Sequence, residues 1–206
     1  MIRAEYPSDH IVGQSIYLRP PSLKDAAEGP WYSWFNDPDT TQFTQHGGLI
    51  NTRESQIEFF ETAMDDESRL LYAICDRKTT KMVGITSIQS IDLKDREAEI
   101  AIMIGEKSHW RRGVSIEAWG LLVQHAFENL PLDRIYAGSH EGLRRWVESL
   151  STIGFEIDST TPDGFVKDGQ LVGTILYSCL RSKFEELKLK HGPFDASVWL
   201  KESQDH

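Results

Sequence analysis

Hydrophobic residues along the chain follow two different periods, and the shorter one marks a group of strands. Residues 97–104 alternate strictly, with one face made of Ala98, Ile100, Ile102 and Ile104. Residues 70–76 and 82–91 are also largely apolar, and only short polar turns separate the three segments. A two-residue period predicts a strand, and strands joined by short turns pair antiparallel. We therefore expect an antiparallel meander over residues 70–104.

The longer period, of three to four residues, predicts the helices. Apolar side chains cover most of the circumference of residues 114–129, which is typical of a helix that is buried on more than one side, such as one lying across a sheet. Asn51 or Thr52 can cap an earlier helix that reaches about residue 64. Ser139 can cap a later one that ends at Gly154. The apolar positions of that later helix are Leu143, Trp146, Val147 and Leu150.

Further strands are expected at residues 16–19, 133–137, 155–158 and 171–180, and a helix at residues 181–190. A short helical segment can begin at Ser22, while the last sixteen residues have no clear pattern. The order of elements is then β-α-α-β-β-β-α-β-α-β-β. This order predicts a single α/β (α+β) domain, with a mixed central sheet, an antiparallel meander and flanking helices.

Composition narrows the functions that this domain can have. The chain has 206 residues with 22 Lys and Arg against 32 Asp and Glu, a formal net charge of −10. That charge argues against nucleic acid as a partner and mildly favours cations such as amines. The longest apolar run is six residues, so no membrane segment is expected. The two cysteines are far apart in the sequence and the N-terminus does not resemble a signal peptide, so we expect reduced core thiols in a cytoplasmic protein. Neither a CxxC nor an HExxH motif occurs, so zinc is not expected.

The stretch at residues 102–115 carries the chemistry. A strand ends at Gly105, a loop with three positive charges follows, and a helix opens at Gly113. A helix N-terminus leaves backbone N–H groups unpaired and carries partial positive charge, so together with Arg111 and Arg112 it can bind a pyrophosphate. A solvated basic surface loop is the alternative interpretation of the same charges.

The run EIAIMIGEKSHWRRGVSIEAWGLLVQHAF, within this order of elements, resembles the GNAT superfamily of acetyl-CoA-dependent N-acetyltransferases. The likeness is closer to the branch of ribosomal-protein N-terminal and flagellar amino-sugar acetyltransferases. The matching stretches are Trp34 to Asp37, Ile104 to Lys107, Trp110 to Ala118, Gly154-Phe155 and Leu180-Arg181. The resemblance covers residues 14–184. It implies an N-terminal extension at 1–13 and a helix end and tail at 185–206.

The resemblance assigns acetyl-CoA as the acetyl donor, without a metal. The residues that it places on the donor are Ile102, Met103 and Ile104 along the strand, and Arg111, Arg112, Gly113, Val114 and Ser115 at the loop. The strand would pair with the pantetheine arm, and the loop would hold the pyrophosphate. In the loop, the chain departs from the family at Trp110 and Ser115, and on the later helix it departs at three further places. Many members have Asn, Ser and a catalytic Tyr where this chain has Leu143, Trp146 and Ser151.

Acetyl transfer to an amine needs a base for the amine and an acid for the departing thiolate. Glu99 is the candidate base, because it resembles the place of a catalytic glutamate in several members; Glu97 shares its face. Both could instead be ordinary solvent-facing residues of an antiparallel strand. Tyr136 is the candidate acid, although a core role is the alternative. His109 could contact the cofactor, and His140 and Glu141 could lie near the sulfur. The alternatives are a solvated loop residue for His109 and surface or capping residues for His140 and Glu141, while His125 is expected in the core.

The aromatic stretch at residues 31–43 could form the wall of an acceptor site, with Trp34, Phe35 and Asn36 as its substrate-binding residues; plain packing is the alternative. The first hypothesis is therefore an N-acetyltransferase in which a primary amine attacks directly in a ternary complex. The amine would belong to an amino sugar, a polyamine or a protein N-terminus, and the enzyme could be a homodimer. The second hypothesis is a catalytically weak acyl-CoA-binding module of the same fold.

Overall fold

A single sheet of eight strands organises the protein, in the order β1-β2-β3-β4-β5-β6-β8-β7. The computed structural model describes residues 10–44, 50–110 and 113–200. The strands are β1 (Ile11–Val12), β2 (Ile16–Arg19), β3 (Leu70–Asp76), β4 (Met82–Asp92), β5 (Glu97–Ile104), β6 (Arg134–His140), β7 (Phe155–Lys167) and β8 (Gln170–Leu180). All neighbours are antiparallel except β5 and β6. The predicted mixed sheet, and the meander formed by β3, β4 and β5, are confirmed.

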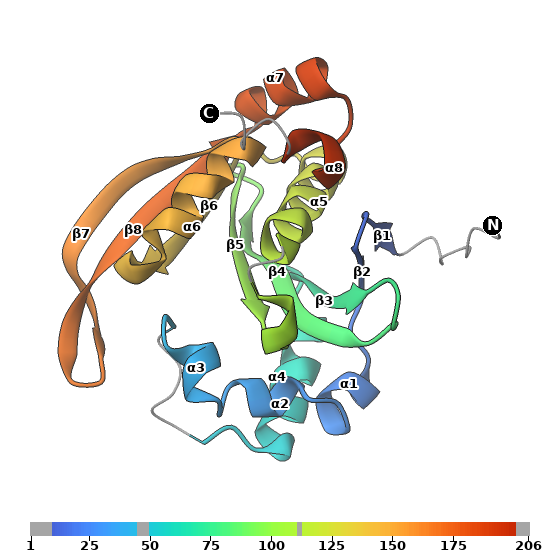
Figure 1. Cartoon of the computed structure of the whole chain (residues 1–206), viewed down its shortest axis with the longest axis vertical. Coiled ribbons are helices and arrows are strands. Elements are labelled where there is room, and N and C mark those ends of the chain that lie inside the picture. Colours follow the sequence, from blue (N-terminus) through green and yellow to red (C-terminus); the bar gives the residue numbers. More distant parts are fainter. Residues whose placement is uncertain (1–9, 45–49, 111–112, 201–206) are drawn as a thin grey trace.

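Helices connect and cover these strands (Figure 1). The α-helices are α1 (Leu23–Ala27), α2 (Trp31–Trp34), α3 (Pro38–Thr41), α4 (Arg53–Asp65), α5 (Val114–Asn129), α6 (Arg144–Ser149), α7 (Arg181–His191) and α8 (Ala196–Trp199). Three 3-10 turns are η1 (Lys107–His109), η2 (Glu141–Leu143) and η3 (Leu150–Ile153). Two of the expected boundaries are set by the predicted local chemistry. The Thr52 hydroxyl caps α4, and Gly154 ends the α6–η3 segment with a left-handed φ of 90°.

Each face of the sheet has its own apolar cluster. On one face the strand residues Ile74, Ile88 and Ile100 pack against Trp119 and Leu122 of α5, which is buried along most of its length as its pattern predicts. On the other face Ala73 and Ile85 pack against Trp31 of α2 and Ala63 of α4. We call these the α5 face and the α4 face. Figure 1 shows α1 to α4 gathered at one end of the molecule, with α7 and α8 at the other.

The sheet divides at its one parallel pair. β5 pairs with β6 only where Glu97–Glu99 face Arg134–Tyr136. Past this point no pairing joins the two strands within the described chain: β5 continues along β4, and β6 continues along β8. The β7–β8 hairpin swings away from the rest of the sheet, as Figure 1 shows. The sheet is therefore continuous at one end of this pair and split at the other.

Several element ends differ from the expectation, each for a tertiary reason. Ser139 is not a helix cap: it lies inside β6, and His140 caps η2 by accepting a hydrogen bond from the Gly142 N–H. β7 reaches Lys167 because it pairs with β8, although its side chains are mostly exposed and polar. The C-terminal stretch, which shows no sequence pattern, contains α8, whose Trp199 is buried against Phe184 and Phe194.

Both cysteines are buried free thiols, as predicted for core residues, and they lie in different clusters: Cys75 on the α4 face and Cys179 on the α5 face. Burial raises the pKa of Cys179 to about 12, so this thiol is protonated at neutral pH. Within the three described ranges, no helix is long and apolar enough to cross a membrane.

Candidate active site

A cleft of about 1060 Å³ opens where β5 and β6 separate. β5 lines it from Glu99 to Ile104, β6 from Gly138 to His140, and α5 with its first residues. The α2–α4 segment and the β7–β8 hairpin contribute further walls. We call this space the β5–β6 cleft. Residues that are far apart in the sequence meet there because the split leaves one edge of each strand without a partner.

The N-terminus of α5 opens into this cleft with unpaired donors. Gly113 is the N-cap residue, with a left-handed φ of 72°, and no side chain of the described residues caps the helix. The first intrahelical bond runs from Glu117 N to Gly113 O at 2.9 Å, so the N–H groups of the three residues between them have no intrahelical acceptor. These donors, with the positive end of the helix dipole, fit a pyrophosphate. Arg111 and Arg112, predicted for the same role, lie outside the described residues.

The predicted donor strand forms one wall of the cleft. Ile102, Met103 and Ile104 all line it, and this part of β5 is unpaired on the side that faces β6. The Ile104 carbonyl accepts a hydrogen bond from Trp110 Nε1 at 2.7 Å. The loop that leads to α5 is therefore anchored to the strand. Free backbone groups along such an edge suit an extended, amide-containing ligand arm, because they can pair with it as a further strand would.

The two candidate bases on β5 have different surroundings. Glu99 lines the cleft on the α4 face, and its Oε2 accepts a hydrogen bond from Gln89 Nε2 at 3.0 Å. Glu97 forms an ion pair with Arg134 at 3.0 Å, and Arg134 also pairs with Asp158 at 2.9 Å. Glu97 is therefore held by a surface network, whereas Glu99 keeps its Oε1 without a hydrogen bond to the described residues.

The early aromatic stretch separates into packing and lining residues. Trp34 is buried beneath Gly105, where an added Cβ would lie 1.9 Å from its ring. Asn36 is bound to the backbone of Asn51, accepting from its N–H at 2.8 Å and donating to its carbonyl at 2.7 Å. Of the three predicted acceptor residues, only Phe35 lines the cleft.

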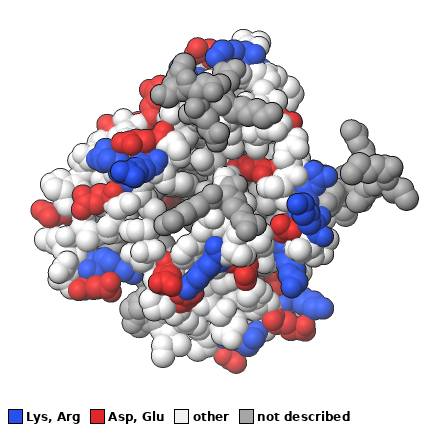
Figure 2. Space-filling view, viewed as in Figure 1, with Lys and Arg blue, Asp and Glu red and all other residues white. Residues whose placement is uncertain are grey.

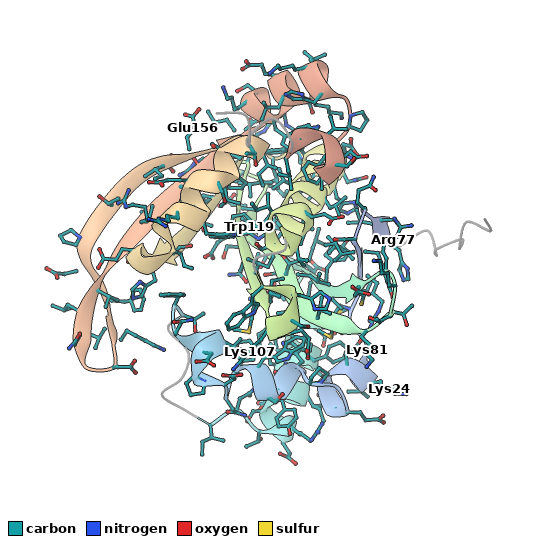
Figure 3. All side chains as sticks on the ribbon, viewed as in Figure 1. Lys24, Arg77, Lys81, Lys107, Trp119 and Glu156 are labelled. Carbon is teal, nitrogen blue, oxygen red and sulfur yellow. The ribbon has the colours of Figure 1, made fainter. Side chains whose placement is uncertain are left out.

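An ion pair joins the same stretch to the end of β5. Lys107, labelled beside α3 in Figure 3, lies 2.8 Å from Asp37 and 2.6 Å from Asp39. Two of the sequence stretches that carry the family resemblance, residues 34–37 and 104–107, are thus in direct contact. Their contact holds α3 against the end of β5.

Three histidines named as candidates lie in different surroundings. His125 contacts Tyr72 Oη at 3.3 Å, and burial lowers its pKa, as expected for a core histidine. His109 lines the cleft and pairs with Asp76 at 3.1 Å. His140 both caps η2 and lines the cleft, where its ring packs between Phe43 (5.3 Å between centroids) and Phe165 (5.7 Å).

Comparison with known proteins decides the family. The model of the acetyltransferase (GNAT) domain matches residues 15–156. The chain belongs to the GNAT acetyltransferase family. It is 21% identical to the uncharacterized N-acetyltransferase p20 of Bacillus licheniformis, over 83% of this chain and 96% of that protein. The flagellar amino-sugar branch stays a prediction.

Solved structures agree in fold. Spermidine N-acetyltransferase from Vibrio cholerae, in complex with CoA and spermine, superposes with a TM-score of 0.75 at 17% identity, over 83% of this chain and 98% of the other. RimL, a ribosomal L7/L12 alpha-N-protein acetyltransferase in complex with CoA, gives a TM-score of 0.72 at 12% identity, over 83% and 97%. This chain is therefore an N-acetyltransferase of the GNAT fold that uses acetyl-CoA.

Two of the three departures of this GNAT enzyme from its family at residues 143–151 lie at the donor end of the cleft. Leu143 and Trp146 both line it. Trp146 Nε1 donates to Ser115 Oγ at 3.0 Å, and its ring packs on Trp119, which Figure 3 shows at the centre of the molecule. The Ser115 hydroxyl is thus engaged with α6, and an indole replaces the smaller polar side chain. Ser151 instead donates to the Glu148 carbonyl at 2.8 Å and is exposed.

Two tyrosines are candidates for the acid of the GNAT enzyme. Tyr136 is the register partner of Glu99, and burial and the negative charge of Glu99 raise its pKa, but it is absent from the described lining of the cleft. Tyr177 does line the cleft, and its Oη lies 2.6 Å from Ser139 Oγ. Burial raises the pKa of Tyr177 as well. Sequence reasoning missed Tyr177, because only the β6–β8 pairing brings it beside Ser139.

Proposed function

We propose that this GNAT enzyme acetylates a primary amine that reaches Glu99 from the α4 face of the β5–β6 cleft. The observation that carries the proposal is the position of Glu99 in the cleft, at the point where the strands part. Gln89 holds one carboxylate oxygen, and the other makes no hydrogen bond to the described residues. The names of two solved relatives support an amine, because a polyamine and a protein N-terminus both present one.

Bound acetyl-CoA supplies an activated acetyl thioester, and the residues of this chain prepare the two partners. Glu99 accepts a proton from the ammonium form of the acceptor, which frees the nitrogen lone pair for attack on the carbonyl carbon. The C–N bond forms as the C–S bond breaks. The N–H groups at the start of α5 and the unpaired edge of β5 hold the donor in place, while the aromatic walls exclude water.

The departing sulfur needs a proton, and a phenol with a raised pKa retains one at neutral pH. Tyr177 is the better placed of the two candidates because it lines the cleft and is oriented by Ser139. Tyr136 stays the alternative. Separate Tyr177→Phe and Tyr136→Phe variants distinguish them, since only removal of the true acid lowers kcat while leaving the affinity for CoA unchanged.

The test is release of thiol from acetyl-CoA against a panel of primary amines. Glu99→Gln should lose rate and retain CoA affinity. Glu97→Gln is the matched control, because it removes the same charge from the same strand outside the cleft; it should keep its rate. Equal losses in the two variants would remove Glu99 from the mechanism. Calorimetric binding of CoA with no thiol release for any amine would favour the acyl-CoA-binding module instead.

A further inference from the structure

An arginine lies on the same face of the sheet as Glu99. Arg69 immediately precedes β3, in which Leu70 pairs with Ile88 of β4, while Gln89 pairs with Glu99. Because side chains alternate along strands, Arg69 shares the α4 face with Leu71 and lies at the level of Gln89 and Glu99. Both charged residues line the β5–β6 cleft.

The guanidinium of Arg69 is largely unpaired. Its Nε lies 3.4 Å from Asp66 Oδ2, and its Cζ lies 5.8 Å from the centre of the Phe59 ring. The Arg69 side chain makes no other hydrogen bond within the described part of the chain, although a guanidinium has five N–H donors. The side chain is only 25% exposed. Its terminal N–H groups have no hydrogen-bond partner among the described residues, so they can bind a group that enters the cleft.

Arg69 differs from the other basic residues near the acceptor side in lining the cleft, which neither Lys107 nor Arg53 does. Lys107 is held between two aspartates, and Arg53 donates to the Ala27 carbonyl while covering the Tyr32 ring. Of the described residues lining the cleft, Arg69 is the only arginine or lysine. On the face of the molecule shown in Figure 2, by contrast, acidic and basic side chains are interspersed.

We propose that the amine acceptor also carries an oxyanion, a carboxylate or a phosphate, which binds Arg69 while the amine lies at Glu99. This inference rests on the proposed function for the position of the amine. Two strand spacings, roughly 10 Å in all, separate the backbone positions of Arg69 and Glu99, and both side chains extend into the cleft. An acceptor of dipeptide size spans this range. Aromatic side chains that line the same cleft can cover its apolar body; they are Trp31, Phe35, Phe43 and Phe59.

The geometry favours this class over a pure polycation. A guanidinium repels a second ammonium group, whereas its terminal N–H groups bind a carboxylate or phosphate through two parallel bonds. The net negative charge of the chain favours cations at a distance, whereas Arg69 acts inside the cleft. The net charge therefore affects the approach of the acceptor, and Arg69 selects which acceptor binds.

The experiment compares acceptors that differ in one charge. Dipeptides with a free C-terminal carboxylate are paired with their C-terminal amides, O-phosphoethanolamine is paired with ethanolamine, and spermidine serves as the polycation. In each pair, we call the acceptor with the carboxylate or phosphate the acid form. In the pair whose oxyanion suits Arg69 better, we expect kcat/KM to be about 10- to 100-fold higher for the acid form than for its uncharged partner. This is the factor typical of a hydrogen bond to a charged group. The arm with the larger ratio identifies carboxylate or phosphate.

Arg69→Gln should bring that ratio close to one, chiefly by raising KM for the acid form, and leave the uncharged acceptor unaffected. Arg69→Lys should restore part of the preference, because it keeps the charge without the planar fork. Arg53→Gln is the matched control and should keep the full preference. Equal rates for acid and amide in the wild type, a preference for spermidine, or an equal loss for both forms in Arg69→Gln would overturn the inference while leaving the proposed function intact.

Binding separates the two proposals when no turnover occurs. The same acceptor pairs are titrated by calorimetry into the CoA-loaded protein. If no amine releases thiol, the proposed function fails. Tighter binding of the acid form that Arg69→Gln abolishes would then still support the oxyanion site, and equal binding of both forms would overturn it.

Discussion

The first turn of α5 is fixed by a buried carboxylate whose removal should destabilise the protein measurably. Glu117 is 4% exposed, and it accepts hydrogen bonds from the backbone N–H of Gln14, from the N–H of Ser15 at 2.9 Å and from the Ser15 hydroxyl. These bonds connect the β1–β2 turn to the helix that opens the donor site. A carboxylate in the first turn of a helix is also stabilised by the helix dipole.

Glu117→Gln is the informative change, because it keeps the shape of the side chain and removes its charge. The amide has one acceptor oxygen and an NH₂ group that is itself a donor, so it can satisfy only part of the three donors. Each lost hydrogen bond contributes about 1 kcal/mol net. Gln14 and Ser15 are exposed overall, and water can replace some of the lost bonds. We therefore expect a loss of about 2–3 kcal/mol in the free energy of unfolding.

For a chain of this length, that loss corresponds to a decrease of roughly 4–12 °C in Tm. Urea unfolding and thermal melting measure it. Glu128→Gln is the control on the same helix: its carboxylate forms an exposed ion pair with Lys188 at 2.8 Å, worth about 0–1 kcal/mol. Hydrogen exchange at the Gln14 and Ser15 amides should also become faster in Glu117→Gln. A Tm loss no larger than that of Glu128→Gln would refute the role of the carboxylate.

Three further predictions follow from the site and its surroundings. Glu99→Gln should lose about 10²–10⁴-fold in rate at neutral pH. The loss should shrink as the pH rises toward the pKa of the amine, ~10 for a lysine-like group. Steady-state rates measured across pH test this. Gly113→Asp should bind CoA at least about tenfold more weakly than Gly113→Asn, a difference of about 1.4 kcal/mol, because only the aspartate adds a negative charge beside the phosphates. Calorimetry compares the two variants. Equal affinities would contradict the assignment of the α5 N-terminus to the pyrophosphate. Burial would raise the pKa of Asp76, but hydrogen bonds from Thr79 and His109 outweigh it and lower the pKa to about 2. The stability that Asp76 contributes is thus complete above its ordinary pKa of 3.8 and is lost as the pH falls toward 2. Asp76→Asn should therefore flatten the fall in Tm over that pH range, and an unchanged profile would contradict it.

The candidate base and the candidate acid show how far sequence reasoning can reach within the site. Glu99 could be placed on a face of β5 from alternation alone, because side chains of a strand point to opposite sides in turn. Its difference from Glu97 could not, because Arg134 comes from β6 and Gln89 from β4. Tyr177 is likewise invisible in the sequence as a cleft residue, since its partner Ser139 is 38 positions away.

The sequence by itself determined the local elements and the chemistry of single segments. Periodicity placed β3, β4, β5 and α5, and the Gly113 start of α5 indicated an anion site, because these features depend on neighbouring residues only. Resemblance added the GNAT family, which the domain match confirmed. The division of the chain at residues 14 and 184, the homodimer and the individual site roles stay predictions.

Only the tertiary structure decided which residues meet. The parallel β5–β6 contact stops at Glu99 and Tyr136, so the cleft exists because two strands diverge, and no local pattern encodes that divergence. The same holds for Arg69: that its guanidinium contacts a single carboxylate, Asp66, among the described residues depends on which side chains lie near it in space. Local propensity acts over one turn or one strand, whereas packing and pairing join positions tens of residues apart, and the candidate active site consists almost entirely of the second kind of contact.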